Sequence, residues 1–293
     1  MLVFHFGYTK WYMRIAPPSL PPLDLPRLLY VRTDRRVRKP RATVVMLHGL
    51  GNTGRAWDEM IAKLPSDIRI IVIDLLGFGK SPKPLKASYN VRIQARSVAM
   101  TLMSLRLSGR VILVGHSMGS LISIELAKRY PLFIKGLVLC SPPLYRTKKE
   151  RVGAFMAAEN LLTSIYSKVS IDATARPEYL LKLAKTAMLA KITSPSLEIT
   201  EQTIAPYATA LKASIIDQTS YRDIQEILPR VKIIYGTLDP FVIPKNLKII
   251  AKNSNTISAQ SIIAFHEVTR PYFKPIKNAI EDLLPQKIDK LNP

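Results

Sequence analysis

Residues 110–130 of the chain read RVILVGHSMGSLISIELAKRY. The apolar run Val111–Val114 predicts a buried strand, and Gly119–Tyr130 predicts a helix. Between them, residues 115–119 (GHSMG) match G-x-S-x-G, the pattern of a nucleophile elbow. So tight a turn needs glycines at both ends, and it holds the central residue in a strained conformation above the sheet. The sequence therefore predicts that Ser117 is a nucleophile.

A serine nucleophile needs a general base, and the chain has four histidines. His5 lies near the N-terminus, and His48 ends a predicted strand beside a glycine loop. His116 adjoins the serine, and we expect its side chain to point away from that of the serine. His266 follows the last predicted strand, and the loops after parallel strands converge on one edge of a sheet. We therefore expect His266 to be the base.

The base in turn needs a carboxylate that orients it and stabilises its cation. Asp239 follows the predicted strand Val231–Tyr235, at a carboxyl end. Three other acids precede that strand and would emerge at the opposite end: Asp217, Asp223 and Glu226. The sequence thus predicts a catalytic triad in the order Ser117, Asp239, His266.

Short apolar runs alternate with longer amphipathic stretches along most of the chain. The apolar runs are Val44–Leu47, Ile68–Ile73, Val111–Val114, Gly136–Leu139, Val231–Tyr235 and Ser261–Phe265. The amphipathic stretches include Asn90–Leu107, Gly119–Tyr130 and Pro244–Asn253. This alternation predicts an α/β fold with a mostly parallel central sheet and helices on both faces.

One interval, residues 146–227, has a helical pattern and no convincing strand. The helical stretches in this region are Lys149–Val169, Arg176–Ala190 and Glu201–Gln218. We expect a helical cap inserted into a core made of residues 28–145 and 228–293. Residues 1–27 form an N-terminal extension, in which the proline-rich Pro17–Pro26 predicts an extended linker.

A second glycine motif, residues 49–54 (GLGNTG), matches G-x-G-x-x-G. It follows a predicted strand and opens a helix, and Asp74 ends the next strand twenty residues later. This is the context of a dinucleotide-binding loop, so a nicotinamide or flavin cofactor is one hypothesis for it.

The chain resembles the α/β-hydrolase superfamily, in particular its serine esterase and lipase-like branch with a helical cap, from about Leu28 to Leu284. The residues that carry the resemblance are His48-Gly49-Leu50-Gly51 with Trp57, the segment Asp74–Ser81, the elbow at Ser117, the segment Leu139–Pro143, Asp239 and His266. Ser117 excludes the branches with an aspartate nucleophile. Phe265 stands where relatives often have glycine, which implies a bulkier or differently shaped loop before the histidine.

The resemblance also changes the interpretation of the second glycine motif. It implies that the backbone N–H groups of Leu50 and Met118 form an oxyanion hole. Gly49 and Gly51 would then let the backbone approach the acyl oxygen of a substrate instead of a pyrophosphate, and Asp74 would anchor the loop 77–81. On this interpretation we expect no organic cofactor and no metal.

The implied activity is hydrolysis of carboxylic esters with small to medium acyl chains, through an acyl-enzyme intermediate. The residues expected to contact substrate are Gly49, Gly51, His116, Tyr145, Phe155, Tyr166 and Phe265. Further candidates for the cap wall are Met156, Leu161, Leu162, Tyr179, Met188 and Tyr207, most of them better explained by packing within the cap. Three alternatives stay open: a carbon–carbon bond hydrolase of dienone acids, a lipase acting at a membrane surface, and a non-catalytic ligand receptor.

Composition limits the partners and the compartment. The chain has 43 Lys and Arg against 21 Asp and Glu, a formal net charge of +22, with the densest cluster at residues 32–41. We read this cluster mainly as solvated surface; it could also contact an anionic membrane, and no zinc-binding or RNA-binding motif points to nucleic acid. The single cysteine, Cys140, excludes an intrachain disulfide. No apolar stretch is long enough to span a membrane and no signal peptide is evident, so we expect a cytoplasmic protein.

Overall fold

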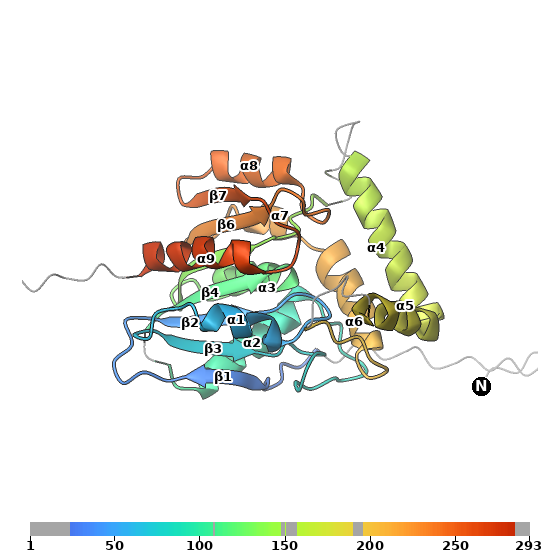
Figure 1. Ribbon diagram of the computed structural model, residues 1–293, viewed down its shortest axis with the longest axis horizontal. Helices are drawn as coiled ribbons and strands as arrows, with labels where there is room; N and C mark the ends of the chain where they lie inside the picture. The colour runs from blue at the N-terminus through green and yellow to red at the C-terminus, as the bar shows by residue number, and fades with distance from the viewer. Residues whose placement is uncertain (1–23, 108, 148–149, 151–156, 190–195, 285–293) are drawn as a thin grey trace, which may run out of the picture.

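The computed structural model describes residues 24–107, 109–147, 150, 157–189 and 196–284, and Figure 1 shows how their elements are arranged. Within these residues, seven strands form one sheet in the order β1-β3-β2-β4-β5-β6-β7. The strands are β1 (Val31–Arg35), β2 (Thr43–Leu47), β3 (Arg69–Ile73), β4 (Val111–His116), β5 (Ile134–Cys140), β6 (Arg230–Gly236) and β7 (Ile257–Ile262). Only β1 pairs antiparallel, so the predicted, mostly parallel sheet is confirmed.

Helices cover both faces of this sheet, as the sequence predicts (Figure 1). One face packs against α2 (Val91–Ser104), α3 (Met118–Arg129) and α8 (Pro244–Lys252). The other face packs against the 3-10 turn η1 (Gly54–Trp57), α1 (Asp58–Ile61) and α9 (Arg270–Leu283). Successive residues of a strand enter different cores, since Val45 belongs to the first and Val44 and Met46 to the second. Burial on both faces is why these strands are continuous apolar runs.

The edge strand β1 was not predicted, because its sequence VRTDR has no apolar pattern. Its charges are tolerated at the edge since they find partners there. Asp34 accepts two hydrogen bonds of 2.8 Å from the guanidinium of Arg69 on β3. This bonding by Arg69 also holds the pKa of Asp34 below its usual value.

The opposite edge corrects the predicted strand Ser261–Phe265, because β7 ends at Ile262. The following residues form a loop that lies against the end of β6. A Cβ atom at Gly236 would lie 2.2 Å from the carbonyl oxygen of Ala264. The apolar residues of this loop predict a buried strand, but the side chains of Ile263 and Phe265 are 81% and 68% exposed.

The structure describes five helical segments between β5 and β6. They are α4 (Ala157–Ala175), α5 (Pro177–Leu189), α6 (Ile204–Ala210), the π-helix η3 (Leu211–Ile216) and α7 (Ser220–Asp223). Figure 1 places α4, α5 and α6 beyond one end of the sheet. The start of the predicted helix Lys149–Val169 and the end of Arg176–Ala190 lie outside the described residues. The bounds of a separate cap domain stay a prediction.

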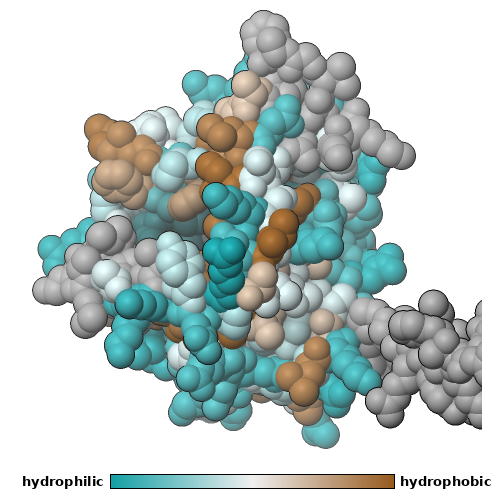
Figure 2. Space-filling model, turned by 90° about the vertical axis from the view of Figure 1, so that its right-hand side faces the viewer, coloured by the Kyte–Doolittle hydropathy of each residue, from teal (hydrophilic) through white to brown (hydrophobic). Residues whose placement is uncertain are grey.

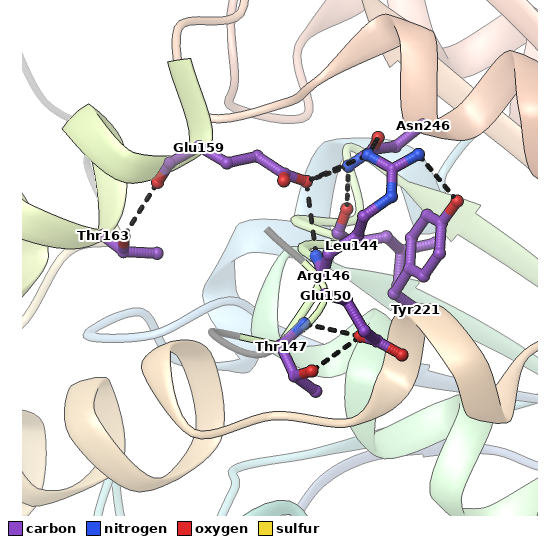
Figure 3. Close-up of polar contacts among 8 residues, drawn as sticks. All are labelled: Leu144, Arg146, Thr147, Glu150, Glu159, Thr163, Tyr221 and Asn246. Carbon is purple, nitrogen blue, oxygen red and sulfur yellow. Dashed lines mark hydrogen bonds and ion pairs between the residues drawn. The ribbon is translucent and has the colours of Figure 1, made fainter. Parts of the chain in front are cut away.

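A buried polar cluster joins α4 to the core (Figure 3). The Arg146 guanidinium donates hydrogen bonds to Asn246 Oδ1 at 2.6 Å and to the Tyr221 hydroxyl at 3.1 Å. The backbone N–H of Arg146 donates to the carboxylate of Glu159 at 3.3 Å, and Asn246 Nδ2 donates to the same carboxylate. Glu159 is in the first turn of α4 and is 2% exposed. These bonds hold the start of α4 against α7 and α8.

Much of the basic cluster at residues 32–41 is engaged in local contacts. Arg32 pairs with Asp58 at 2.8 Å, and Arg41 pairs with Asp67 and Glu281, both at 3.1 Å. Arg35 donates hydrogen bonds to backbone carbonyls of neighbouring loops. The interpretation of the cluster as solvated surface and its contact with an anionic membrane both stay predictions. None of the described helices is long and apolar enough to cross a membrane.

Candidate active site

The turn between β4 and α3 has the geometry predicted for a nucleophile elbow. Ser117 has φ +51° and ψ −117°, a conformation that costs about 1–3 kcal/mol for a residue with a side chain. A Cβ atom at Gly119 would lie 2.3 Å from the Leu47 carbonyl oxygen, and one at Gly115 would lie 2.4 Å from the Gly119 carbonyl oxygen. The glycines are therefore required where strand, turn and helix approach one another. Ser117 itself is 8% exposed.

His266 and Asp239 meet, as the sequence predicts. His266 Nδ1 lies 2.8 Å from Asp239 Oδ2, and the backbone N–H of Phe241 donates to Asp239 Oδ1 at 2.8 Å. Burial of the carboxylate favours its neutral form, but the hydrogen bond and charge of His266 outweigh burial, helped by bonds from Ser141 and Phe241. The net result is that the pKa of Asp239 lies below its usual value. A buried carboxylate in this state can orient an imidazole and stabilise its cation.

His116, the residue before Ser117 in the elbow, contacts His266. The imidazole rings of His116 and His266 have centroids 4.9 Å apart, and His116 Nε2 donates to the His266 carbonyl at 2.9 Å. The nucleophile candidate and the base candidate therefore lie side by side at the carboxyl ends of the strands. No described residue forms a hydrogen bond with Ser117 Oγ, so direct proton transfer from Ser117 to His266 stays a prediction. Such bonds often tighten only when substrate binds.

His116, expected to contact substrate, is buried at 1% exposure. Burial lowers its pKa, so the ring is neutral at pH 7. Its Nδ1 has no hydrogen-bond partner among the described residues, and it would lie 2.9 Å from a Cβ atom at Gly49. His116 thus lies beneath the glycine loop and contacts the loop that carries His266.

The two candidate oxyanion donors come from two segments. The glycine loop after β2 supplies the Leu50 N–H, and the elbow supplies the Met118 N–H. The N–H groups of Leu50 and Met118 have no acceptor among the described residues. Gly51 has φ +75°, which favours glycine, and a Cβ atom there would lie 3.0 Å from Leu197 and 3.1 Å from Tyr207. The loop thus lies against residues that follow α5, and the Gly51 carbonyl accepts a hydrogen bond from the Glu198 N–H at 2.7 Å.

His48 has a structural role in this loop. Its Nε2 accepts a hydrogen bond from the Leu75 N–H at 2.9 Å, and its Nδ1 donates to the Gly49 carbonyl at 2.8 Å. The ring is fully buried, and burial lowers the pKa of His48 to about 4. The neutral ring therefore links the ends of β2 and β3.

This burial makes stability depend on pH. Below pH 6.5 the unfolded chain protonates His48, whereas the folded protein protonates it only near pH 4. We expect the free energy of unfolding to fall by about 3 kcal/mol from this residue as pH drops from 6.5 to 4. Urea unfolding at pH 7 and pH 4.5 should show a smaller difference in His48→Gln than in the wild type. An equal pH dependence in both proteins would contradict the assignment.

Asp74 anchors the second glycine motif. Its Oδ1 accepts the Gly54 N–H at 2.7 Å, and its Oδ2 accepts the Lys80 N–H at 2.9 Å. A Cβ atom at Gly79 would lie 2.2 Å from this carboxylate, which is 3% exposed. Both oxygens are therefore used inside the protein, and Asp74 cannot bind the ribose of a dinucleotide as that hypothesis requires. Asp74 thus joins the end of this motif, at Gly54, to the loop 77–81, at Lys80.

Aromatic side chains contact the His266 loop from the side of α4. Tyr145 is buried, and its hydroxyl donates to the Phe241 carbonyl at 2.5 Å. Tyr166 on α4 stacks on Phe241, with centroids 5.9 Å apart, and Phe241 makes an edge contact with His266. Phe241 was not among the predicted site residues. The signal that could have found it is its place two residues after Asp239.

The other predicted substrate contacts fall in different places. Phe155 and Met156 lie outside the described residues, and so does the side chain of Met188. Leu162, Tyr166 and Tyr207 pack against the core. Leu161 and Tyr179 are 63% and 61% exposed, so neither is buried by packing within the described part of the cap, and their contact with substrate stays a prediction. Figure 2 views the end of the molecule that carries the inserted helices and shows apolar side chains among hydrophilic ones.

Comparison with known proteins shows the family to which this fold belongs. A family model of the alpha/beta hydrolase fold matches residues 42–264. The chain belongs to the α/β-hydrolase family. Among solved structures, the enol-lactonase from Burkholderia xenovorans superposes with a TM-score of 0.70 at 19% identity, covering 87% of this chain and 95% of that one. An esterase from Exiguobacterium antarcticum gives a TM-score of 0.67 at 17% identity, covering 88% and 98%. At these identities the α/β-hydrolase resemblance is one of fold.

Curated relatives match over shorter stretches. The probable lysophospholipase BODYGUARD 2 of Arabidopsis thaliana is 32% identical over 124 residues, which is 41% of this α/β hydrolase and 26% of the relative. The putative carbamate hydrolase RutD of Pantoea ananatis is 37% identical over 97 residues, which is 33% of this chain and 35% of the relative. The alignments thus span only about a quarter to a third of these relatives.

Proposed function

We propose that this α/β-hydrolase chain is a serine hydrolase that cleaves carboxylic esters of small to medium acyl chain. Ser117 is the nucleophile, His266 the general base and Asp239 the carboxylate that orients it. The observation that carries the proposal is the 2.8 Å contact between His266 and the buried Asp239, at the sheet edge where Ser117 is held in a strained elbow. Names of relatives that include esterase, lysophospholipase and carbamate hydrolase support cleavage at an acyl carbon.

The reaction proceeds in two steps. His266 Nε2 takes the proton of Ser117 as its oxygen attacks the ester carbonyl carbon, and the Leu50 and Met118 N–H groups stabilise the oxyanion. The tetrahedral species collapses, the alcohol leaves with the proton from His266, and Ser117 is acylated. Water, deprotonated by His266, then attacks the acyl group and releases the acid. Asp239 keeps the imidazole in the tautomer that this sequence requires.

We further propose that the segment of residues 146–227 is a cap that sets acyl-chain length. Its contribution near the site includes Tyr166, which lies against Phe241, and Tyr207, which lies over Gly51. These aromatic rings lie beside the loop of the base candidate and beside the loop of an oxyanion-donor candidate. They favour an uncharged acyl group of limited length.

A fluorophosphonate probe tests this proposal directly. The expected result is stoichiometric labelling that peptide mapping assigns to Ser117, together with hydrolysis of p-nitrophenyl esters that is maximal at a short or medium chain. Labelling at another residue would overturn the assignment of the nucleophile. A protein that neither labels nor hydrolyses any ester of the series would favour the alternative of a ligand receptor.

A further inference from the structure

Phe241 connects three parts of the candidate site that the sequence separates. Its ring makes a T-shaped contact with the His266 imidazole, with centroids 5.0 Å apart and planes at 78°. The same ring stacks on Tyr166, with centroids 5.9 Å apart and planes at 24°. The Phe241 side chain therefore lies in contact with both the base candidate and helix α4.

The main chain of Phe241 makes a separate set of contacts. Its N–H donates to Asp239 Oδ1 at 2.8 Å, and its carbonyl accepts the Tyr145 hydroxyl at 2.5 Å. These bonds hold the carboxylate and the backbone of the loop, and they do not depend on the nature of the side chain at 241. A substitution at position 241 therefore removes the contacts of the ring and leaves these main-chain hydrogen bonds possible.

The imidazole of His266 needs more than its bond to Asp239. One hydrogen bond at Nδ1 leaves the ring free to rock about that bond, which moves Nε2 relative to the serine oxygen. Among the residues that the structure describes, two aromatic rings contact the imidazole, that of His116 at 4.9 Å and that of Phe241 at 5.0 Å. His116 belongs to the elbow and is itself bonded to the His266 backbone, so within this described part the ring of Phe241 is the restraint that comes from outside the elbow.

We propose that Phe241 is a positioning residue, whose ring holds His266 in its productive orientation and couples that orientation to α4 through Tyr166. The proposal rests on the proposed function of His266 as the base. The beginning of α4 is held on the core by the Arg146–Glu159–Asn246 cluster, so Tyr166 projects from an anchored helix (Figure 3). A fixed cap helix thereby contributes to the geometry of the base.

The test compares Phe241→Leu with Phe241→Tyr, and it uses Phe273→Leu on α9 as a matched control outside the site. For Phe241→Leu we expect kcat to fall about 10- to 100-fold, since a small misplacement of a catalytic group has effects of this size. KM should change less than about twofold, because the ring acts on the base and not on substrate affinity. Phe241→Tyr should retain most of the activity, and Phe273→Leu should behave as the wild type. Tyr166→Ala should lower kcat in the same direction, whereas Tyr166→Phe should not.

A second readout does not depend on activity. The Nδ1 proton shared by His266 and Asp239 gives a downfield proton NMR signal, assigned by its loss in His266→Gln. We expect Phe241→Leu to shift or broaden this signal and Phe273→Leu to leave it unchanged. An unchanged signal with unchanged kcat in Phe241→Leu would overturn the proposal. If the wild type shows no hydrolase activity, the proposed function fails, and the NMR comparison still decides whether Phe241 positions His266.

Discussion

Ser117→Ala is expected to lower kcat about 10⁶-fold and to abolish fluorophosphonate labelling, because it removes the attacking oxygen. The fold should persist, since alanine at φ +51° carries the same backbone strain as the serine. Ser117→Gly should be equally inactive but more stable by about 1 kcal/mol, because glycine adopts this conformation without strain. Thermal unfolding of the three proteins measures that difference.

Asp239→Asn is expected to lower kcat about 10⁴-fold while leaving Ser117 in place. An asparagine whose amide donates to His266 Nδ1 holds the imidazole in the tautomer that carries its proton on Nε2, which cannot accept the proton of the serine. Labelling of Ser117 should therefore become slow and should not disappear. Steady-state kinetics and labelling rates of Ser117→Ala, Asp239→Asn and the wild type check the assignment. Near-normal activity in either variant would show that the triad is assigned wrongly.

Gly119→Ala is expected to destroy the elbow, although alanine is the better helix former by about 1 kcal/mol. The added Cβ would lie 2.3 Å from the Leu47 carbonyl oxygen and 2.7 Å from that of His48. Both are backbone atoms of a central strand and its end, so neither can move without displacing the sheet. We expect a loss of stability of several kcal/mol and loss of Ser117 labelling. Circular dichroism melts and probe labelling measure both effects.

Gly109→Ala is the control for this substitution. Gly109 also has a positive φ, of +75°, but in the described part of the chain no heavy atom other than those of its own sequence neighbours lies within 4 Å of the position of its Cβ. The Gly109→Ala variant should be less stable by only about 1 kcal/mol, because alanine adopts a positive φ less readily than glycine, and Ser117 should still be labelled fully. Equal behaviour of the two variants would show that the close approach at Gly119 is not what the elbow requires.

The fold was predictable from sequence wherever strands are buried on both faces. The central strands β2, β3, β4, β5 and β6 are apolar runs because helices cover them on each side. The sequence does not predict the two edges of the sheet correctly, and the reasons at β1 and β7 are opposite. β1 has no apolar pattern, and its charged residues are stabilised in the strand by partners such as Arg69 for Asp34. The apolar residues 261–265 predict a strand, although the side chains of Ile263 and Phe265 face solvent. The hydropathy of a segment predicts whether it is buried. At an edge strand of the sheet a strand can form without being buried, so hydropathy does not predict the strand there.

The two glycine motifs show the same limit within the site. Each is a local pattern with more than one use. The elbow at Ser117 is predictable from a strand, a turn and a helix that are contiguous in the chain. The loop at residues 49–54 needed tertiary information, because only the burial of Asp74 between Gly54 and Lys80 excludes its binding a ribose.

The sequence by itself determined the identity and order of the candidate triad. A serine in a glycine turn, one suitably placed histidine and one aspartate at a strand end are properties of local pattern and topology. Only the tertiary structure decided what surrounds that triad. The contacts of His266 with His116 and Phe241, and of Phe241 with Tyr166, join segments far apart in the chain. No periodicity records such contacts, because they arise when separate loops and an inserted helix pack at one edge of the sheet.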